Sequence, residues 1–245
     1  MAFSLIGTRG KQSADTVTTG NTTAIDTTTA DLIVVVRSFY QAVGTPNLSD
    51  SAGCTWTNLM AYSSTNTRVI ISYCSQFSGL VTSASHTFVA TTAATATYPS
   101  ISVIVLSGAK TSADPFDSGK DAGANTSGAT SLAPGSLTPS EDNCLLVTGI
   151  AAGNGSGAPG GVTGYTIDQS FDFVTTGGGR SGGIAHLIQT TAGASNPSWT
   201  FSSDEAAAAL AVFKAATGGG ATGHPTMRRW GGVPGMSGNN IGRGW

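Results

Sequence analysis

Charged side chains are scarce in this chain, and their scarcity narrows the classes of protein to which it can belong. They make up 10% of the 245 residues, and the formal net charge is -2. No dense run of Lys and Arg is present, which argues against a nucleic-acid-binding arm. Hydroxyl residues and 34 glycines fill most segments that are not apolar. This composition favours an extracellular or virion surface over that of an intracellular enzyme.

Long apolar stretches are lacking as well. A transmembrane helix needs about 18 to 20 consecutive apolar residues, and no run in the sequence reaches that length. Residues 1–7 have neither the basic start nor the apolar segment of a signal peptide. We therefore expect no membrane contact. A protein made in a host cytoplasm and released by lysis within an assembled particle fits these features.

Cysteine is rare, and its pattern is uninformative for metal binding. Cys54, Cys74 and Cys144 are odd in number and form no CxxC pair. We expect them to be buried reduced thiols. Cys54 and Cys74 flank two neighbouring predicted strands, so a disulfide between them is a less favoured alternative that would require an oxidising compartment.

The strongest positive signal is one apolar run. Leu32 to Val36 are five consecutive apolar residues, which cannot alternate between a solvent-facing and a buried face. The run therefore predicts a strand in the middle of a sheet, with another layer packed on it. The rest of the protein is expected to form a sandwich or barrel around this strand.

Short strands recur along the rest of the chain. They are predicted at residues 54–59, 67–73, 86–89, 100–106, 144–150, 165–167, 171–174, 183–188 and 199–201. The Ala-rich residues 205–214 are predicted as the last strand, with a helix as the alternative. The polar residues 107–143 are expected to be a long connection between sheets.

This pattern predicts an all-β fold: a single β-sandwich of jelly-roll or Greek-key type with an extended N-terminal segment and a Gly-rich C-terminal arm. The expected divisions are an N-terminal arm or edge strand at residues 1–20, the sandwich at 21–216, and the arm at 217–245.

Several motifs follow one another in a distinctive order. They are TTAIDTT and DLIVV within residues 22–35, DSAG at 50–53, DPFD at 114–117, LTPSEDN at 137–143 and NPSW at 196–199. In this succession the chain resembles an uncharacterised β-sandwich family found in phage and bacterial genomes. The resemblance covers about residues 20–216. It implies a virion or surface protein, and it transfers no residue-level function.

Catalytic and cofactor motifs are weak. Residues 179–183 match G-x-S-x-G, but a strand follows where a hydrolase needs a helix. Two G-x-G-x-x-G matches, at 155–160 and 177–182, open no helix that would hold a pyrophosphate. A hydrolase using Ser181 and His186 is therefore only a third hypothesis. We predict no enzyme activity, no catalytic residue and no cofactor.

Metal-binding residues are equally sparse. His186 alternates with Ile184 and Ile188, which favours a structural histidine on a buried face. His86 and His224 have no partner at metal-ligand spacing. No metal is predicted, although a calcium site is an alternative at three aspartates in a polar loop. These are Asp114, Asp117 and Asp121.

The C-terminal 29 residues combine a flexible hinge with residues typical of interfaces. Residues 217–245 hold three Arg and no acid, whereas residues 1–216 hold 8 basic and 13 acidic side chains, giving +3 and -5. Arg and Trp are enriched where binding energy concentrates, and Met adapts to irregular pockets. The predicted interface residues are Met227, Arg228, Arg229, Trp230, Arg243 and Trp245.

These features predict a non-enzymatic phage virion protein of the capsid decoration, cement or fibre-like type, assembling through its C-terminal arm. Its expected partners are copies of itself in a symmetric homo-oligomer such as a trimer, and other virion proteins such as the major capsid protein. The alternative is a carbohydrate-binding or adhesion module on a virion or bacterial surface. Its candidate sugar-stacking residues are Trp56, Trp199, Tyr40 and Tyr62.

Overall fold

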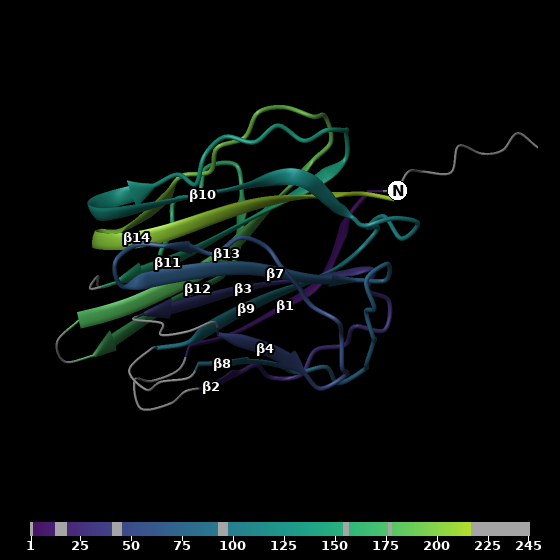
Figure 1. The fold of residues 1–245 in the computed structure, drawn as a ribbon, viewed down its shortest axis with the longest axis horizontal. Coiled ribbons are helices and arrows are strands. Elements are labelled where there is room, and N and C mark those ends of the chain that lie inside the picture. The colour runs from purple at the N-terminus through teal and green to yellow at the C-terminus, as the bar shows by residue number, and fades with distance from the viewer. Residues whose placement is uncertain are drawn as a thin grey trace, which may run out of the picture.

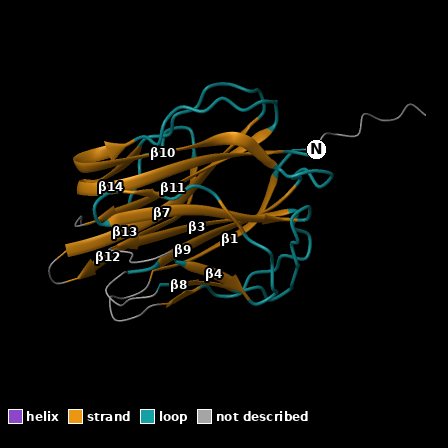
Figure 2. Cartoon of the chain, in the orientation of Figure 1, coloured by secondary structure: helices purple, strands orange, loops and turns teal. Residues whose placement is uncertain are grey.

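The protein is built from antiparallel β-sheets. A computed structural model describes residues 2–12, 19–40, 46–92, 98–153, 157–175 and 178–216, and within these ranges it contains strands and loops but no helix (Figure 2). The described residues accordingly include no helix suited to spanning a membrane. The predicted all-β class is confirmed.

Three sheets account for all the strands described. The six-stranded sheet has the order β1-β9-β3-β7-β5, with β6 also on β7; the five-stranded sheet has the order β10-β14-β11-β13-β12; and the three-stranded sheet has the order β2-β8-β4. The bounds are β1 (Ser4–Gln12), β2 (Thr19–Asn21), β3 (Leu32–Tyr40), β4 (Asn47–Asp50), β5 (Thr57–Asn58), β6 (Tyr62–Ser63), β7 (Thr67–Ser75), β8 (Phe88–Thr91), β9 (Ser100–Ser107), β10 (Phe116–Leu132), β11 (Cys144–Gly153), β12 (Thr166–Thr175), β13 (Gly178–Gln189) and β14 (Trp199–Lys214).

The sheets are stacked in layers, with the six-stranded sheet in the middle (Figure 1). Alternate residues of β3 point to opposite faces: Leu32, Val34 and Val36 join the core shared with the five-stranded sheet. Ile33 and Val35 join a second core, which is shared with the three-stranded sheet. This double burial explains why the run is continuously apolar, and it confirms the predicted central strand.

The Ala-rich segment forms a strand, as predicted, because both of its faces are buried. Ala207, Ala209 and Ala211 of β14 face the core between the large sheets. Ala206 and Ala208 face the opposite side, where they pack in a cluster that includes Trp199. Small side chains fit between closely packed layers, and this packing overrides the helix propensity of alanine.

The prediction of a long connection at residues 107–143 was wrong, because this stretch contains β10, one of the longest strands. β10 pairs with β14 over most of its length and lies at the edge of the five-stranded sheet. Its side chains are mostly small and partly exposed, so they do not show the alternation by which strands are recognised. Two other boundaries also differ: the strand expected at 54–59 is limited to β5, and 165–167 and 171–174 belong to the single strand β12.

Gly149 sets how closely the two large sheets approach. It lies in β11, and a Cβ atom built there would be 2.5 Å from Cγ1 and 2.9 Å from Cγ2 of Val36 on β3. Real Cβ atoms do not approach so closely, and the buried Val36 side chain has no open space to move into.

We predict that Gly149→Ala lowers the free energy of unfolding by roughly 1–3 kcal/mol, because the extra methyl group overpacks the core. Gly128→Ala is the matched control: Gly128 lies exposed on β10, and a Cβ atom added there would have no other atom within 4 Å. Urea unfolding of both variants measures the difference. Equal midpoints for the two variants would contradict this packing.

Candidate functional site

Two thiols, an imidazole and a carboxylate meet beside the second core. We call Asp50, Cys54, Cys74 and His86 the thiol cluster. Asp50 ends β4, Cys54 lies in the turn that follows, and Cys74 is the penultimate residue of β7. His86 comes just before β8 and is held by an isolated bridge to Ile25. Three segments that are distant in sequence thus converge.

The Asp50 carboxylate organises the turn that carries Cys54. It accepts hydrogen bonds from the backbone N–H groups of Ala52 (2.9 Å), Gly53 (2.7 Å) and Cys54 (3.1 Å to Oδ2), and from Trp56 Nε1 (2.7 Å). Burial raises the pKa of Asp50, but these bonds and one to His86 outweigh it, so the pKa lies below its ordinary value. The carboxylate is therefore ionised at neutral pH.

His86 is fully buried, and both of its ring nitrogens are engaged. Nε2 lies 2.8 Å from Asp50 Oδ1, and Nδ1 lies 3.1 Å from Thr27 Oγ1. Because a carboxylate only accepts, Nε2 donates. Thr27 Oγ1 also lies 3.1 Å from the Ser83 carbonyl, so its proton has an acceptor whether Nδ1 is protonated or not. This environment accommodates both the neutral and the charged imidazole.

The pKa of His86 is raised overall. Burial lowers it, but hydrogen bonds to Cys54 and Asp50 and their negative charges outweigh burial. The ring also stacks on Phe88, with centroids 4.3 Å apart. The pKa of His86 and that of Cys54 therefore shift in the directions that favour an imidazolium beside a thiolate.

The two thiols differ in access to solvent, and their interaction shifts their pKa values in opposite directions. Cys54 is partly exposed, whereas Cys74 is fully buried. The interaction with Cys74 lowers the pKa of Cys54 to about 6, helped by interactions with His86 and the Val81 N–H. The Val81 nitrogen lies 3.4 Å from Cys54 Sγ. The interaction with Cys54, together with burial, raises the pKa of Cys74 well above its ordinary value.

A metal ion would find suitable donor types here but would have to compete with existing bonds. The ligand atoms of Asp50, Cys54 and His86 lie within 4.8 Å of one another, and carboxylate, thiolate and imidazole are all zinc ligands. Both ring nitrogens of His86 are already hydrogen-bonded, as are both oxygens of Asp50. The arrangement is better suited to holding and activating a thiol than to enclosing a cation.

Sequence reasoning missed this cluster. His86 was expected to have no partner at metal-ligand spacing, but Asp50 and Cys54 reach it from another part of the chain. The one usable signal was the expectation that Cys54 and Cys74 lie near each other on adjacent strands. All three cysteines are free thiols, as predicted, although Cys54 is not buried.

The residues of the hydrolase hypothesis do not come together. Ser181 and His186 both lie on β13, and their odd separation places them on opposite faces, about 16 Å apart along the strand. Ser181 is in a regular strand rather than in a sharp turn. His186 is buried, as predicted, and its Nδ1 lies 2.7 Å from the Asp168 carboxylate.

The three aspartates of the calcium hypothesis have separate environments. Asp114 accepts hydrogen bonds from the Tyr73 hydroxyl, at 2.9 Å and 3.0 Å. Asp117 accepts from the Ser140 hydroxyl at 2.8 Å and pairs with Lys214 at 3.3 Å. Among the described residues, these aspartates do not form a group with converging ligand atoms.

The four aromatic residues considered for sugar stacking are also dispersed. Trp199 is fully buried, and Trp56 packs edge-on against Phe88 while its indole bonds Asp50. The Tyr62 ring lies directly over Gly123. Tyr40 is different, because it lines a small cavity at the end of β3.

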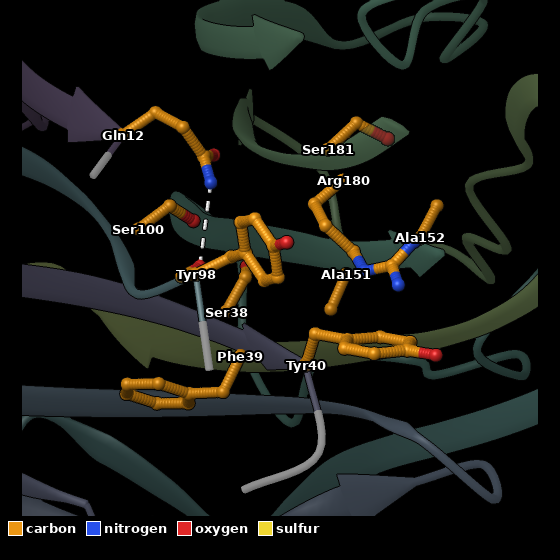
Figure 3. A pocket seen from close by; sticks show the side chains of 10 residues that line it. All are labelled: Gln12, Ser38, Phe39, Tyr40, Tyr98, Ser100, Ala151, Ala152, Arg180 and Ser181. Carbon is orange, nitrogen blue, oxygen red and sulfur yellow. Dashed lines mark hydrogen bonds between the residues drawn. The ribbon is translucent and has the colours of Figure 1, made fainter. Parts of the chain in front are cut away.

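Arg180 lies over the ring of Tyr40 in that cavity (Figure 3). Its guanidinium carbon is 3.3 Å from the Tyr40 centroid and 5.3 Å from that of Tyr98. Gln12 donates a hydrogen bond to the Tyr98 carbonyl at 3.3 Å. The remaining space is about 10 Å³, which is room for one water molecule. The stack fills this cavity and leaves no room for a sugar.

The predicted interface residues lie outside the described residues. They are Met227, Arg228, Arg229, Trp230, Arg243 and Trp245.

Comparisons with known proteins found no match: no family model, curated protein or solved structure matches the chain.

We predict that Asp50→Asn lowers the free energy of unfolding by about 2–4 kcal/mol at pH 5, because buried His86 and the donors of the turn lose a charged acceptor. The folded-state pKa of Asp50 is depressed, so its contribution is present above about pH 3.8 and is lost as the pH falls through the folded-state pKa. The difference from wild type should therefore shrink between pH 5 and pH 2.5.

Denaturant unfolding across that pH range measures the effect. Asp26→Asn is the control, since Asp26 is exposed and bonds mainly with Thr28 in its own turn. It should leave stability close to that of wild type. A difference for Asp50→Asn that stayed constant down to pH 2.5 would contradict the ionised network.

Proposed function

We propose that this chain is a non-enzymatic structural protein of a phage particle, of the capsid decoration, cement or fibre-like type. In this proposal the body is a single β-sandwich of jelly-roll or Greek-key type, related to the phage and bacterial family that the sequence resembles. The C-terminal arm joins it to neighbouring copies or to the capsid lattice, and the protein acts in the virion.

The observation that carries the proposal is where the folded body ends. Phe213 and Ala215 are buried in the core between the large sheets. Ala109 and Ala215 form a bridge, and the Ala216 N–H donates to the Gly108 carbonyl at 2.7 Å. The described body therefore keeps its core packing up to its last residues. We infer that the 29 residues that follow serve a partner, because they hold three Arg, two Trp and no acid.

Charge supports the same assignment. The described body falls within residues 1–216, whose net charge is -5, and residues 217–245 carry +3. An arm of this sign is attracted to the acidic body of another copy. Trp230 and Trp245 lie close in sequence to Arg229 and Arg243, so the middle and the end of the arm each offer the residue types that dominate binding energy.

The position of β10 at a sheet edge supports the proposal of a partner surface on the body. β10 is an edge strand whose ladder partner is β14, and its regular stretch Asp121–Ser127 is rich in small residues. A protein that repeats on a lattice needs such regular, accessible surfaces.

We predict that the full chain is a defined homo-oligomer, whereas a chain ending at Ala216 is a folded monomer. Light scattering gives the two masses, and circular dichroism checks that both fold. A second comparison keeps the chain at full length: Arg228→Ala/Arg229→Ala/Trp230→Ala should dissociate the oligomer. Thr222→Ala/Thr226→Ala is the matched control within the arm. The same number of subunits in all four proteins would overturn arm-mediated self-assembly.

A further inference from the structure

The thiol cluster has no role in the assembly proposed above, and its geometry points to a separate chemical property. We propose that Cys54 is a thiol-modification site that reacts with low-molecular-weight disulfides such as oxidised glutathione, and that Cys74 then converts the product into an internal disulfide. The proposal does not depend on the virion assignment.

Solvent access fixes which thiol reacts first. Cys54 is partly exposed in the turn after β4, whereas Cys74 is fully buried in β7. Thr57, three residues after Cys54, pairs with Tyr73, so the strand pairing brings Cys54 close to Cys74. A dissolved disulfide can therefore reach Cys54 but not Cys74. Once Cys54 has reacted, Cys74 is the neighbouring thiol in position to displace the attached group. Cys144 is buried near Glu141 and is no part of this cluster.

The surroundings of Cys54 stabilise its thiolate. The charged and titratable groups that act on it are Cys74 from β7, His86 from the segment before β8 and Asp50 from the end of β4. The Val81 nitrogen lies 3.4 Å from the sulfur, and a ring nitrogen of His86 lies within 4.8 Å of it. Interactions with Cys74 and with His86 favour the thiolate. The carboxylate of Asp50 opposes thiolate formation, but it also orients His86 and favours the imidazolium. Together these interactions lower the pKa of Cys54 to about 6.

The reaction proceeds in two exchange steps. In the first, the Cys54 thiolate attacks one sulfur of oxidised glutathione, the sulfur–sulfur bond breaks, and one glutathione leaves as a thiolate that takes up a proton. In the second, the Cys74 sulfur attacks Cys54 Sγ, and the second glutathione leaves with the proton that Cys74 gives up. Two protein thiols are oxidised to one disulfide, and one glutathione disulfide is reduced to two glutathiones.

The product would fasten the turn that follows β4 to the six-stranded sheet. This turn bears Trp56, which covers part of the second core. A crosslink between residues 54 and 74 restricts the unfolded chain, so the oxidised protein should unfold at a temperature higher by roughly 5–10 °C. Exposure to an oxidising medium would thus stabilise the body without any change of fold.

The experiment uses the full chain, purified reduced and then incubated with oxidised glutathione at pH 7. Intact mass and thiol counting follow the products. We expect wild type to lose two hydrogens and to keep one free thiol, that of Cys144. Cys74→Ser should stop at a glutathione adduct on Cys54, and Cys54→Ser should stay unmodified. Cys144→Ser is the matched control and should form the disulfide as wild type does.

The pH dependence of the reaction rate distinguishes a Cys54 thiolate stabilised by its surroundings from a thiol that is only exposed. The rate at which wild type loses its first thiol should follow thiolate formation of Cys54 at a pH below the ordinary thiol value of 9.0, and His86→Gln should move the profile to higher pH. Circular dichroism confirms that each variant is folded.

Several results would overturn the proposal. One is a wild-type protein that keeps three reduced thiols, and another is Cys54→Ser reacting as fast as Cys74→Ser. A third is a purified protein whose Cys54 and Cys74 are protected by a bound metal ion until a chelator is added, which would make the cluster a metal site.

Discussion

Burial of the six-stranded sheet on both faces is the constraint on which the rest of the structure depends. Its central strand β3 sends Leu32, Val34 and Val36 into one core and Ile33 and Val35 into another, so neither face can be left to solvent. The five-stranded sheet covers the first face and the small three-stranded sheet covers the second. The close approach at Gly149 and the small residues of β14 follow from the first of these contacts.

The contact between the six-stranded and the three-stranded sheets contains buried polar groups, and the reactive thiol lies among these groups. Arg37 of β3 is buried and donates to the Pro46 carbonyl, the Asn58 side chain and the Ser72 hydroxyl. Burial lowers its pKa to about 10. Asp50 and His86 form a second polar group beside the same core. The three-stranded sheet has little apolar area of its own, so such hydrogen bonds fix its position. The second of these groups, Asp50 with His86, holds the Cys54 thiol in an activating environment.

The sequence predicted those parts of the fold that depend on local pattern. The run at Leu32–Val36 indicated a doubly buried strand, and the apolar residues ending the segment 205–214 favoured a strand over a helix. The strand β10 was missed because glycine, serine and threonine at a sheet edge carry no periodicity. The thiol cluster was missed for another reason: Asp50, Cys54 and His86 converge from separate segments, and the β5–β7 pairing brings Cys74 beside them, so no sequence spacing records the cluster.

Native-state hydrogen exchange tests the central claim most directly, since it measures the opening free energy of each backbone amide. If the doubly buried sheet holds all three layers together, the amides of Leu32 to Val36 should exchange only through global unfolding. Their opening free energy should then equal the unfolding free energy from denaturant titration. Exchange of these amides through a much smaller local opening, while β11 and β14 stay protected, would contradict the account.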